Sequence, residues 1–212
     1  MTALQALGEL GTTIDISPQA KSAACEAIVD LVTAAAAAPR RSVTAALREA
    51  YGPGASSVWF TGERASPVAA GFVNALHAAA LDLDDGHRLS RGHPGAAVIP
   101  AVFAQADHIE AGGQSLSNES LIRAVVIGYE LSLRIASARG FYARTGFWAG
   151  FAAAAGAGSL AGLSAIELAN AMAIAGETGP HMATTTTLPA WPQPNGSDVK
   201  EGIPWGVATG LS

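Results

Sequence analysis

The sequence predicts an all-α protein, a multi-helix bundle built largely from small side chains. Alanine and glycine supply 47 and 24 of the 212 residues, half of all residues are hydrophobic, and only 6% are aromatic. This composition favours closely packed helices over β-sheets, whose strands are rich in β-branched and aromatic residues. Apolar positions also recur at helical spacing between Pro, Gly and capping residues. The length fits one domain or a compact pair, and we expect one helical domain over residues 1–212.

Several helix boundaries are marked by residues with capping roles. Ser17 can cap a first helix, Pro18 suits its first turn, and Pro39 ends it. Ser164 and Glu167 have the spacing of a capping box. In chain order, helices are expected over residues 18–38, 42–50, 66–80, 94–111, 117–135 and 149–163, from 164 onward, and over 199–212. The run SSVWF, residues 56–60, is the best strand candidate.

The segment AGFAAAAGAGSLAGL, residues 149–163, has no face lined by bulky side chains. Helices of this kind gain stability only when neighbouring helices come close, so we expect this one at the centre of a layered bundle. A partly exposed Ala-rich helix is the alternative. Residues 184–198 contain four Thr and three Pro, so this segment cannot form a regular helix.

Charge and cysteine content exclude several classes of function. The net charge is −5 and the basic residues form no run longer than Arg40–Arg41, so we expect no nucleic-acid binding. A single cysteine, Cys25, excludes an internal disulfide and a Cys-based zinc or iron–sulfur site within this chain alone. The apolar stretches are too short for a membrane span, and the N-terminus lacks a secretory pattern. We therefore expect a cytoplasmic protein.

A polar cluster interrupts the helical pattern between residues 82 and 93. Asp82, Asp84, Asp85, His87 and His93 fall within twelve residues. Carboxylates this close raise one another's affinity for protons if they are buried, and nearby imidazoles could share those protons. Two His and a carboxylate could also bind zinc or iron, but the spacing matches no standard motif, and we expect no metal. A solvated acidic loop that caps a helix is the plain alternative.

His93 strengthens the functional interpretation of this cluster. Pro94 suits the first turn of a helix, which places His93 at the helix N-terminus. The positive end of the helix dipole favours a neutral imidazole there, ready to accept a proton.

Residues 139–146, RGFYARTG, form a second cluster. Glycines bracket a turn that presents the Tyr142 phenol, the Arg144 guanidinium and the Thr145 hydroxyl ahead of the Ala-rich helix. The planar Arg fork suits a carboxylate ligand, because it makes two parallel hydrogen bonds. An ordinary connection with an exposed Arg is the alternative.

Two single residues complete the set. His181 follows an apolar helix and leads into the irregular segment, the kind of loop that lines pockets, although a lone His is more often structural. Lys200 is one of only two lysines and precedes an apolar helix. It could bind a carboxylate or act as an acid or base if partly desolvated, or it could be a solvated residue beside Glu201.

Taken in order, these clusters resemble the MmgE/PrpD family, which includes 2-methylcitrate dehydratase, cis-aconitate decarboxylase and iminodisuccinate epimerase. Family members have an LDFDD stretch followed by a His-Pro pair, a Gly-Phe-His turn before an Ala/Gly-rich helix, an ANALAIAG helix and a later Lys. This chain has, in the same order, LDLDDGHRLSRGHPG, RGFYARTGFWAGFAAAAGAG, ANAMAIAG and DVKEGIPWG. The resemblance covers nearly the whole chain from about residue 18.

The resemblance implies the helical domain of these proteins and a cofactor-free lyase of the dehydratase type, or an isomerase. Such an enzyme acts on a small di- or tricarboxylate by proton abstraction. The resemblance assigns Asp82, His93 and Lys200 to the active site, and Tyr142, which replaces the usual His of the turn, is a candidate acid. The candidate substrate-binding residues are Asp85, His87, Arg144, Thr145 and His181.

The resemblance also implies a part of the enzyme outside this chain. Family chains continue into an α+β lid domain that supplies further site residues, whereas this sequence stops at Ser212, inside the helical part. We therefore expect this helical chain to be one half of a split enzyme, in which a second polypeptide or a partner protomer supplies the lid. The remaining possibility is that this chain has lost catalysis. The alternative is a non-catalytic helical subunit that binds or stabilises a full-length relative. These residues do not distinguish dehydration from decarboxylation or epimerisation.

Overall fold

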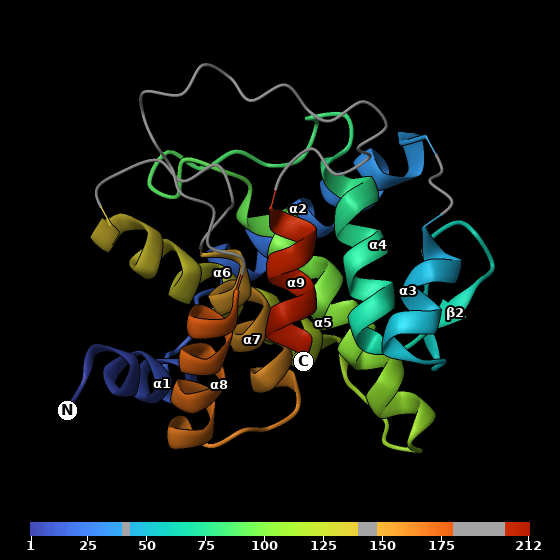
Figure 1. The fold of residues 1–212 in the computed structure, drawn as a ribbon. Coiled ribbons are helices and arrows are strands. Elements are labelled where there is room, and N and C mark those ends of the chain that lie inside the picture. The colour runs from blue at the N-terminus through green and yellow to red at the C-terminus, as the bar shows by residue number, and fades with distance from the viewer. Residues whose placement is uncertain (40–42, 140–147, 180–201) are drawn as a thin grey trace, which may run out of the picture.

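The computed structural model describes residues 1–39, 43–139, 148–179 and 202–212, and it confirms the all-α architecture (Figure 1). Within these ranges the chain forms nine helices and one two-stranded antiparallel sheet. The helices are α1 (Ala3–Thr13), α2 (Pro18–Ala37), α3 (Thr44–Tyr51), α4 (Pro67–Ala79), α5 (Pro94–Ala111), α6 (Asn118–Arg139), α7 (Ala149–Leu160), α8 (Ala165–Thr178) and α9 (Ile203–Leu211). The strands are β1 (Ser56–Ser57) and β2 (Arg64–Ala65).

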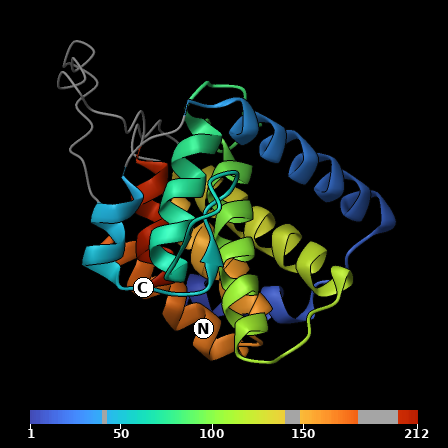
Figure 2. The same cartoon turned by 90° about the vertical axis from the view of Figure 1, so that its right-hand side faces the viewer.

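The Ala-rich helix α7 lies at the centre of the bundle, as its composition predicts. It contacts α5, α6, α8 and α9, and every one of its residues except Ser159 is buried. Helix α4 contacts α5 and α9 on one side, while the long α2 lies across the outside of α4, α5 and α6 (Figure 2). The expectation of a layered bundle around residues 149–163 is therefore confirmed.

Glycines bring the neighbours of α7 into close contact with it. A Cβ on Gly210 of α9 would lie 2.6 Å from both the Ala153 Cβ and the Gly150 carbonyl oxygen. On α6, a Cβ on Gly128 would lie 2.7 Å from Val98 Cγ1 of α5 and 3.1 Å from Gly156 Cα of α7. A side chain at either position would have to separate the helices, because protein interiors leave no spare volume.

Most predicted boundaries agree with the structure because the capping chemistry is local. The Ser17 hydroxyl accepts the Ala20 N–H at 3.2 Å, and Pro18 is the first residue of α2. At the start of α8, Glu167 Oε2 accepts the backbone N–H of Ser164 at 2.9 Å, as the capping box predicts. The last helix begins at Ile203, and the part of its prediction that covers residues 199–201 lies outside the described residues.

One helix, α1, was absent from the sequence prediction, which placed the first helix at residue 18. The Thr2 hydroxyl accepts the Gln5 N–H at 3.2 Å, and the Gln5 side chain accepts the Thr2 N–H at 2.8 Å, so a capping box starts α1. Gly8 and Gly11 lower the helix propensity of this segment. In the structure both glycines are buried, and a Cβ on Gly8 would meet α8. Packing against α8 therefore outweighs local propensity.

The strand candidate SSVWF forms only the two-residue strand β1, paired with β2 in the register Ser56–Ala65 and Ser57–Arg64. Its position is fixed by α5, since the Ser56 hydroxyl donates to the Ala104 carbonyl at 2.7 Å and the Ser57 N–H donates to Asp107 Oδ2 at 2.6 Å. The predicted strand was correct in place but too long.

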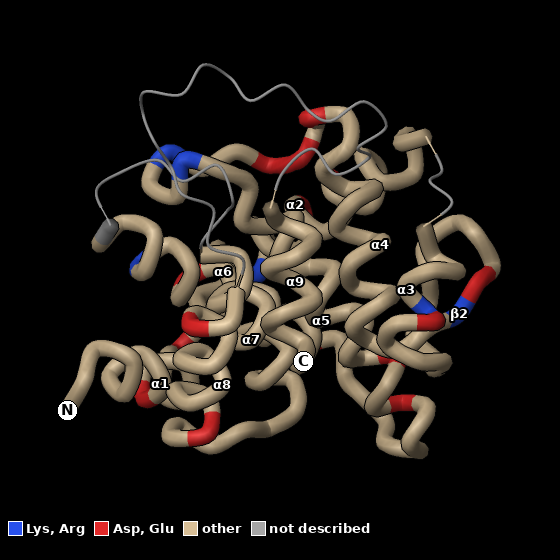
Figure 3. The backbone as a smooth tube through the Cα atoms, in the orientation of Figure 1, with Lys and Arg blue, Asp and Glu red and all other residues tan. Residues whose placement is uncertain are grey.

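Charged residues are sparse on the helical body (Figure 3). Acidic and basic positions both occur on the long loop that connects α4 to α5, which lies at the top of Figures 1 and 3. Among the described residues, no helix combines the length and apolar character needed to cross a membrane. The predicted irregular segment 184–198 lies outside the described residues.

We expect the substitution Gly210→Ala to lower the free energy of unfolding by about 1–3 kcal/mol, the usual cost of overpacking a core. The added methyl group would meet the backbone of α7, at 2.6 Å from Gly150 O and 2.8 Å from Ala154 N, and backbone atoms cannot rotate away. Urea denaturation followed by circular dichroism measures the change.

The matched control is Gly86→Ala, because a Cβ at Gly86 has no neighbouring atom within 4 Å. This control should change the free energy of unfolding by less than about 1 kcal/mol. Equal stability of G210A and the parent protein would contradict the close contact between α7 and α9.

Candidate functional site

The polar cluster predicted from the sequence lies on the loop between α4 and α5. Helix α4 ends at Ala79, and the Asp82 N–H donates to the Ala79 carbonyl at 3.3 Å. Asp82 has φ of 58°, in the left-handed region that a non-glycine residue adopts at a cost of about 1–2 kcal/mol, although Asp tolerates it better than most. This conformation turns the chain sharply at the end of α4. Strained residues of this kind often occur at functional sites.

The loop then folds back on itself through short-range hydrogen bonds. The His87 N–H donates to the Gly92 carbonyl at 3.0 Å, and the Arg91 N–H donates to the His87 carbonyl at 2.9 Å. The Ser90 hydroxyl, which is buried, also donates to the His87 carbonyl at 3.0 Å. As a result, His93 returns to the side of the loop from which Asp82 and Asp84 project.

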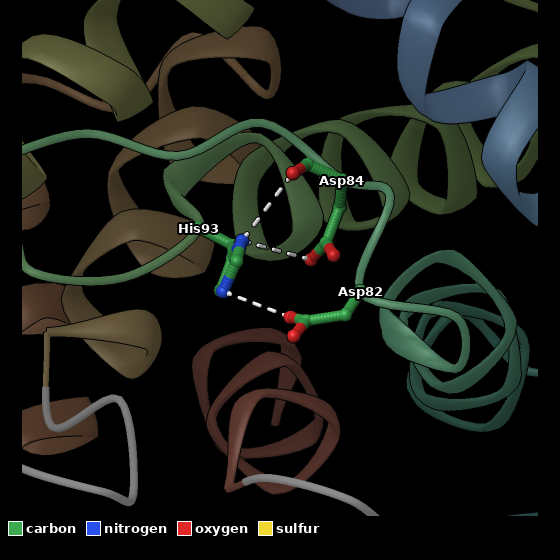
Figure 4. A group of neighbouring side chains, drawn as sticks. All are labelled: Asp82, Asp84 and His93. Atoms are coloured by element: carbon green, nitrogen blue, oxygen red, sulfur yellow. Dashed lines mark hydrogen bonds and ion pairs between the residues drawn. The ribbon is translucent and has the colours of Figure 1, made fainter.

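Asp82, Asp84 and His93, which we call the acid–imidazole cluster, face one another (Figure 4). The Nε2 atom of His93 lies 3.5 Å from Asp82 Oδ1, and its Nδ1 atom lies 3.5 Å from Asp84 Oδ2. The side chain of Asp84 is fully buried, that of His93 is 21% exposed, and that of Asp82 is 61% exposed. The cluster therefore runs from a buried carboxylate to one that solvent or a ligand can reach.

Backbone geometry determines which ring nitrogen of His93 carries a proton. The Nδ1 atom lies 2.9 Å from the carbonyl oxygen of Asp85 and 3.4 Å from that of Asp84. Because a carbonyl oxygen can only accept, Nδ1 must be the donor, which assigns the hydrogen to Nδ1. In the neutral imidazole Nε2 is then the basic atom, and it is the ring nitrogen that lies beside the exposed Asp82.

His93 also occupies the predicted position at a helix N-terminus. It is the N-cap residue of α5, and Pro94 is the first helical residue. Its side chain makes no capping hydrogen bond, so the ring is not used to hold the helix end. That function belongs to Asp85, whose Oδ1 accepts the Gly95 N–H at 2.9 Å.

Asp85 is bonded on both carboxylate oxygens. Its Oδ2 accepts the hydroxyl of Tyr129, on α6, at 2.6 Å. Burial raises the pKa of the Asp85 carboxyl, while the hydrogen bonds from Tyr129 and Gly95 act in the opposite direction. Burial and the neighbouring Asp85 carboxylate raise the pKa of Tyr129, so its hydroxyl stays protonated at neutral pH and donates. Asp85 thus ties the loop to two helices.

Aromatic residues hold the far end of the loop. The Trp148 ring packs so closely on Gly92 that a Cβ there would lie 2.7 Å from it. The ring of His87 meets the ring of Tyr129 edge to face, with centroids 6.1 Å apart. His87 therefore lies beside Tyr129, the residue that also bonds Asp85.

The structure brings together part of the predicted site. Asp82, Asp85, His87 and His93 all lie on this one loop. The other candidates lie outside the described residues, and they are Tyr142, Arg144, Thr145, His181 and Lys200.

Tyr129 is a site residue that sequence reasoning did not select. It lies within a helical segment, whereas the residues predicted to form the site are polar groups at helix breaks. The available signal was its neighbour Gly128, since a glycine inside a helix usually has a packing reason. Here Gly128 lets α6 approach α5 and α7, which places the next residue against Asp85.

The described part of the site is rich in negative charge. The carboxylates of Asp82 and Asp84 lie beside the His93 imidazole, the Asp85 carboxylate lies on the same loop, and the two basic residues of this loop, Arg88 and Arg91, are exposed. Such a group can exchange a proton at Nε2 of His93. Ligand atoms of the acid–imidazole cluster also lie within 4.8 Å of one another, close enough for these three residues to hold a metal ion.

A separate surface pocket of about 420 Å³ lies between α2, α5 and the β1–β2 connection. Its walls include Val32, Trp59 and Phe103, and it shares no residue with the acid–imidazole cluster. Because this pocket has mainly apolar walls and no histidine, it does not offer the proton-transfer chemistry of the loop.

Comparison with known proteins supports the resemblance noted from the motifs. The chain matches the family described as MmgE/PrpD N-terminal domain over residues 11–204. Cis-aconitate decarboxylase from Aspergillus terreus is 36% identical over 86 residues, which make up 41% of this chain and 18% of the relative. Cis-aconitate decarboxylase from Aspergillus terreus strain NIH 2624 / FGSC A1156 gives the same values. The matched segment thus spans less than a fifth of the length of these relatives.

The family match begins inside α1 and ends at the start of α9, so it includes α2 to α8 in full and the loop that carries the acid–imidazole cluster. It covers far more than half of the chain, and the chain therefore belongs to the MmgE/PrpD N-terminal domain family.

Proposed function

We propose that this domain carries the proton-transfer part of a lyase or isomerase that acts on a small di- or tricarboxylate. The observation that supports this proposal best is the setting of His93. Its Nδ1–H is directed to the Asp85 carbonyl, and its Nε2 lies beside the exposed Asp82. A histidine with one nitrogen fixed and the other accessible is suited to general acid–base catalysis.

The proposed reaction begins at the carbon next to a substrate carboxylate. Nε2 of His93 takes the proton from this carbon, and the electron pair of the broken C–H bond delocalises into the neighbouring carboxylate. The imidazolium that forms has Asp82 Oδ1 and Asp84 Oδ2 each at 3.5 Å from a ring nitrogen. These carboxylates stabilise the positive charge as it develops.

Three outcomes can follow from the same chemistry. Loss of the β-hydroxyl group as water, with its proton supplied by Tyr142 as the proposed second acid, gives an alkene and completes a dehydration. Delivery of a proton by this second acid to the opposite face of the carbon gives the epimer, while His93 keeps the proton that it removed. In a decarboxylation the order differs, because loss of carbon dioxide leaves the electron pair on carbon and the imidazolium then supplies the proton. The decarboxylase relatives make this third outcome a reaction to test first.

Binding of an anionic substrate requires positive charge near the acid–imidazole cluster. The carboxylates of Asp82, Asp84 and Asp85 would repel a di- or tricarboxylate. We propose that Lys200 and Arg144 supply the compensating charge and that Tyr142 serves as the second acid, without a metal or organic cofactor. Arg144 is suited to a carboxylate because its fork makes two parallel hydrogen bonds.

A non-catalytic helical subunit is the alternative, and one surface observation favours it. Three leucines on the site loop are exposed, with 41% exposure at Leu81, 60% at Leu83 and 59% at Leu89. Apolar side chains gathered on one loop often mark a partner surface. The same feature suits an enzyme whose site is completed by a lid or by another chain, so the two functions share the expectation of a partner.

We expect the substitution His93→Gln to lower kcat at least about tenfold, which corresponds to roughly 1.4 kcal/mol of transition-state stabilisation. Glutamine keeps polarity near this position but cannot take up a proton. Steady-state turnover of cis-aconitate, 2-methylcitrate and iminodisuccinate by the assembled protein measures the effect. Unchanged turnover in H93Q would remove His93 from the mechanism.

The matched control for this experiment is His108→Gln, an exposed histidine in the last turn of the same helix α5. Its turnover should equal that of the parent protein. A chelator distinguishes proton transfer from metal catalysis, since EDTA should leave kcat unchanged if no metal is required. Loss of turnover with EDTA and recovery with a divalent cation would assign the acid–imidazole cluster to a metal instead.

We expect Lys200→Gln to lower kcat/KM at least about tenfold, mainly through a higher KM, because a lost charge weakens binding of substrate and transition state alike. The matched control is the other lysine, in Lys21→Gln. Lys21 pairs with Glu119 at an exposed position, and surface pairs of this kind contribute little. Equal kcat/KM for K200Q and the parent protein would exclude Lys200 from anion binding.

We expect the purified protein to form an assembly larger than one 21.3 kDa chain, either with itself or with a chain that completes the site. Native mass spectrometry and light scattering measure the mass. Leu83→Asp should weaken this assembly, whereas Val29→Asp, at an equally exposed position on α2, should not. A monodisperse monomer that binds no carboxylate and recruits no second chain would contradict both the enzyme and the subunit hypotheses.

A further inference from the structure

We propose that Tyr129 is a positioning residue that acts through Asp85 to hold His93 in its Nδ1–H form, with Nε2 presented to the substrate. The inference rests on the proposed function, because it assigns a part in that reaction to a residue from a different element of the fold. Tyr129 does not itself reach the acid–imidazole cluster. Its effect passes through the peptide group of Asp85, whose carbonyl oxygen is bonded to the His93 ring.

Asp85 links three parts of the molecule. Its Oδ2 accepts from Tyr129 at 2.6 Å, its Oδ1 accepts from the Gly95 N–H at 2.9 Å, and its carbonyl oxygen lies 2.9 Å from His93 Nδ1. The side chain and the carbonyl belong to one residue with few free torsions. Anchoring of the carboxylate therefore limits where the carbonyl oxygen can lie.

The Tyr129 hydroxyl, which donates to Asp85, is held rigidly by helix α6. Tyr129 follows Gly128, where α6 crosses α5 and α7 so closely that a methyl group would collide with Val98 and Gly156. The helix cannot shift without disturbing the core, so the phenol is held by the best-packed part of the bundle. Functional groups are positioned more accurately by such supports than by loops alone. The raised pKa of Tyr129 keeps the hydroxyl protonated as a donor.

Gly95 allows the Asp85 carboxylate to reach both the Tyr129 hydroxyl and the backbone N–H of Gly95 itself. A Cβ at this position would lie 2.4 Å from Asp85 Oδ1 and 3.0 Å from its Cγ. Only glycine therefore allows the Asp85 side chain to lie across the start of α5 with Tyr129 on its other side. The glycine, the aspartate and the tyrosine fit together as one support for the loop.

A purely structural role for the Tyr129–Asp85 hydrogen bond makes a different prediction. In that case loss of the hydroxyl would lower stability and leave the His93 ring as it is. The two interpretations are separated by the tautomer of His93, which can be read in the folded protein by ¹⁵N NMR of the imidazole nitrogens. This measurement needs no substrate and no turnover.

The experiment compares Tyr129→Phe with the parent protein at the alkaline end of a pH series, where the ¹⁵N signals of the imidazoles no longer change with pH. The His93 signals are assigned by their loss in H93Q. We expect the parent protein to show the Nδ1–H form and Y129F to shift toward the Nε2–H form that free histidine prefers. The matched control is Tyr51→Phe, an exposed tyrosine on α3, which should keep the parent spectrum.

A second variant keeps the proposal testable if Y129F is poorly folded. Asp85→Asn retains an acceptor for the Gly95 N–H and a polar group that can bond the Tyr129 oxygen, so the Nδ1–H form should persist. Asp85→Ala removes both anchors, and the Nδ1–H form should be lost. Urea denaturation of each variant confirms that the spectra come from folded protein.

Turnover provides the second readout. We expect Y129F to lower kcat about tenfold with KM changed less than about twofold, because orientation of the base matters in the transition state more than in the bound ground state. Persistence of the Nδ1–H form in folded Y129F, or an Nε2–H form in the parent protein, would overturn the proposal. If the parent protein turns over none of the carboxylates while the tautomer shifts as expected, the proposed function fails and the positioning of His93 by Tyr129 stands.

Discussion

The close contact of glycine-bearing helices around α7 is the constraint on which the rest of the structure depends. Because α7 has no large side chains apart from Phe151 and Leu160, it contributes stability only if α5, α6 and α9 approach it to backbone distance. Gly128, Gly156 and Gly210 occupy the points of contact. The same contacts fix the angle and depth of α6, and so they also determine where the Tyr129 hydroxyl lies.

The site loop depends on this helical body for its shape. The fourteen residues between α4 and α5 are largely polar and rich in charge, a composition that by itself does not favour an ordered structure. Contacts with the helical body hold the loop in place. Asp85 bonds Gly95 of α5 and Tyr129 of α6, and the Trp148 ring packs against Gly92. The loop also bonds itself through the backbone of His87. Conformational entropy is thus lost during folding, so that His93 would already be in position for the proposed proton transfer.

The described part of the site carries negative charge, whereas a site that binds a polycarboxylate also needs positive charge. The buried Asp84, the exposed Asp82 and the hydrogen-bonded Asp85 concentrate negative charge on the loop, which disfavours binding of a polyanion there. In the proposed function, Lys200 and Arg144 would supply cations that reverse this balance at the substrate, and the exposed leucines of the loop would offer a surface for the proposed lid or partner. On that proposal the helical domain supplies the acid–base chemistry, while binding of the anion depends on groups outside the acid–imidazole cluster.

The sequence by itself determined the local features, including the helix starts at Ser17, Ser66 and Ser164, the central place of the Ala-rich helix, and the polar loop with His93 before Pro94. Each of these depends on neighbours only a few residues away, so a pattern can reveal it. Tertiary structure alone decided that α1 is helical and that Asp85 bonds Tyr129 across 44 residues. The reason is physical: these features depend on the distance of approach between helices, which glycines permit but which no local pattern specifies.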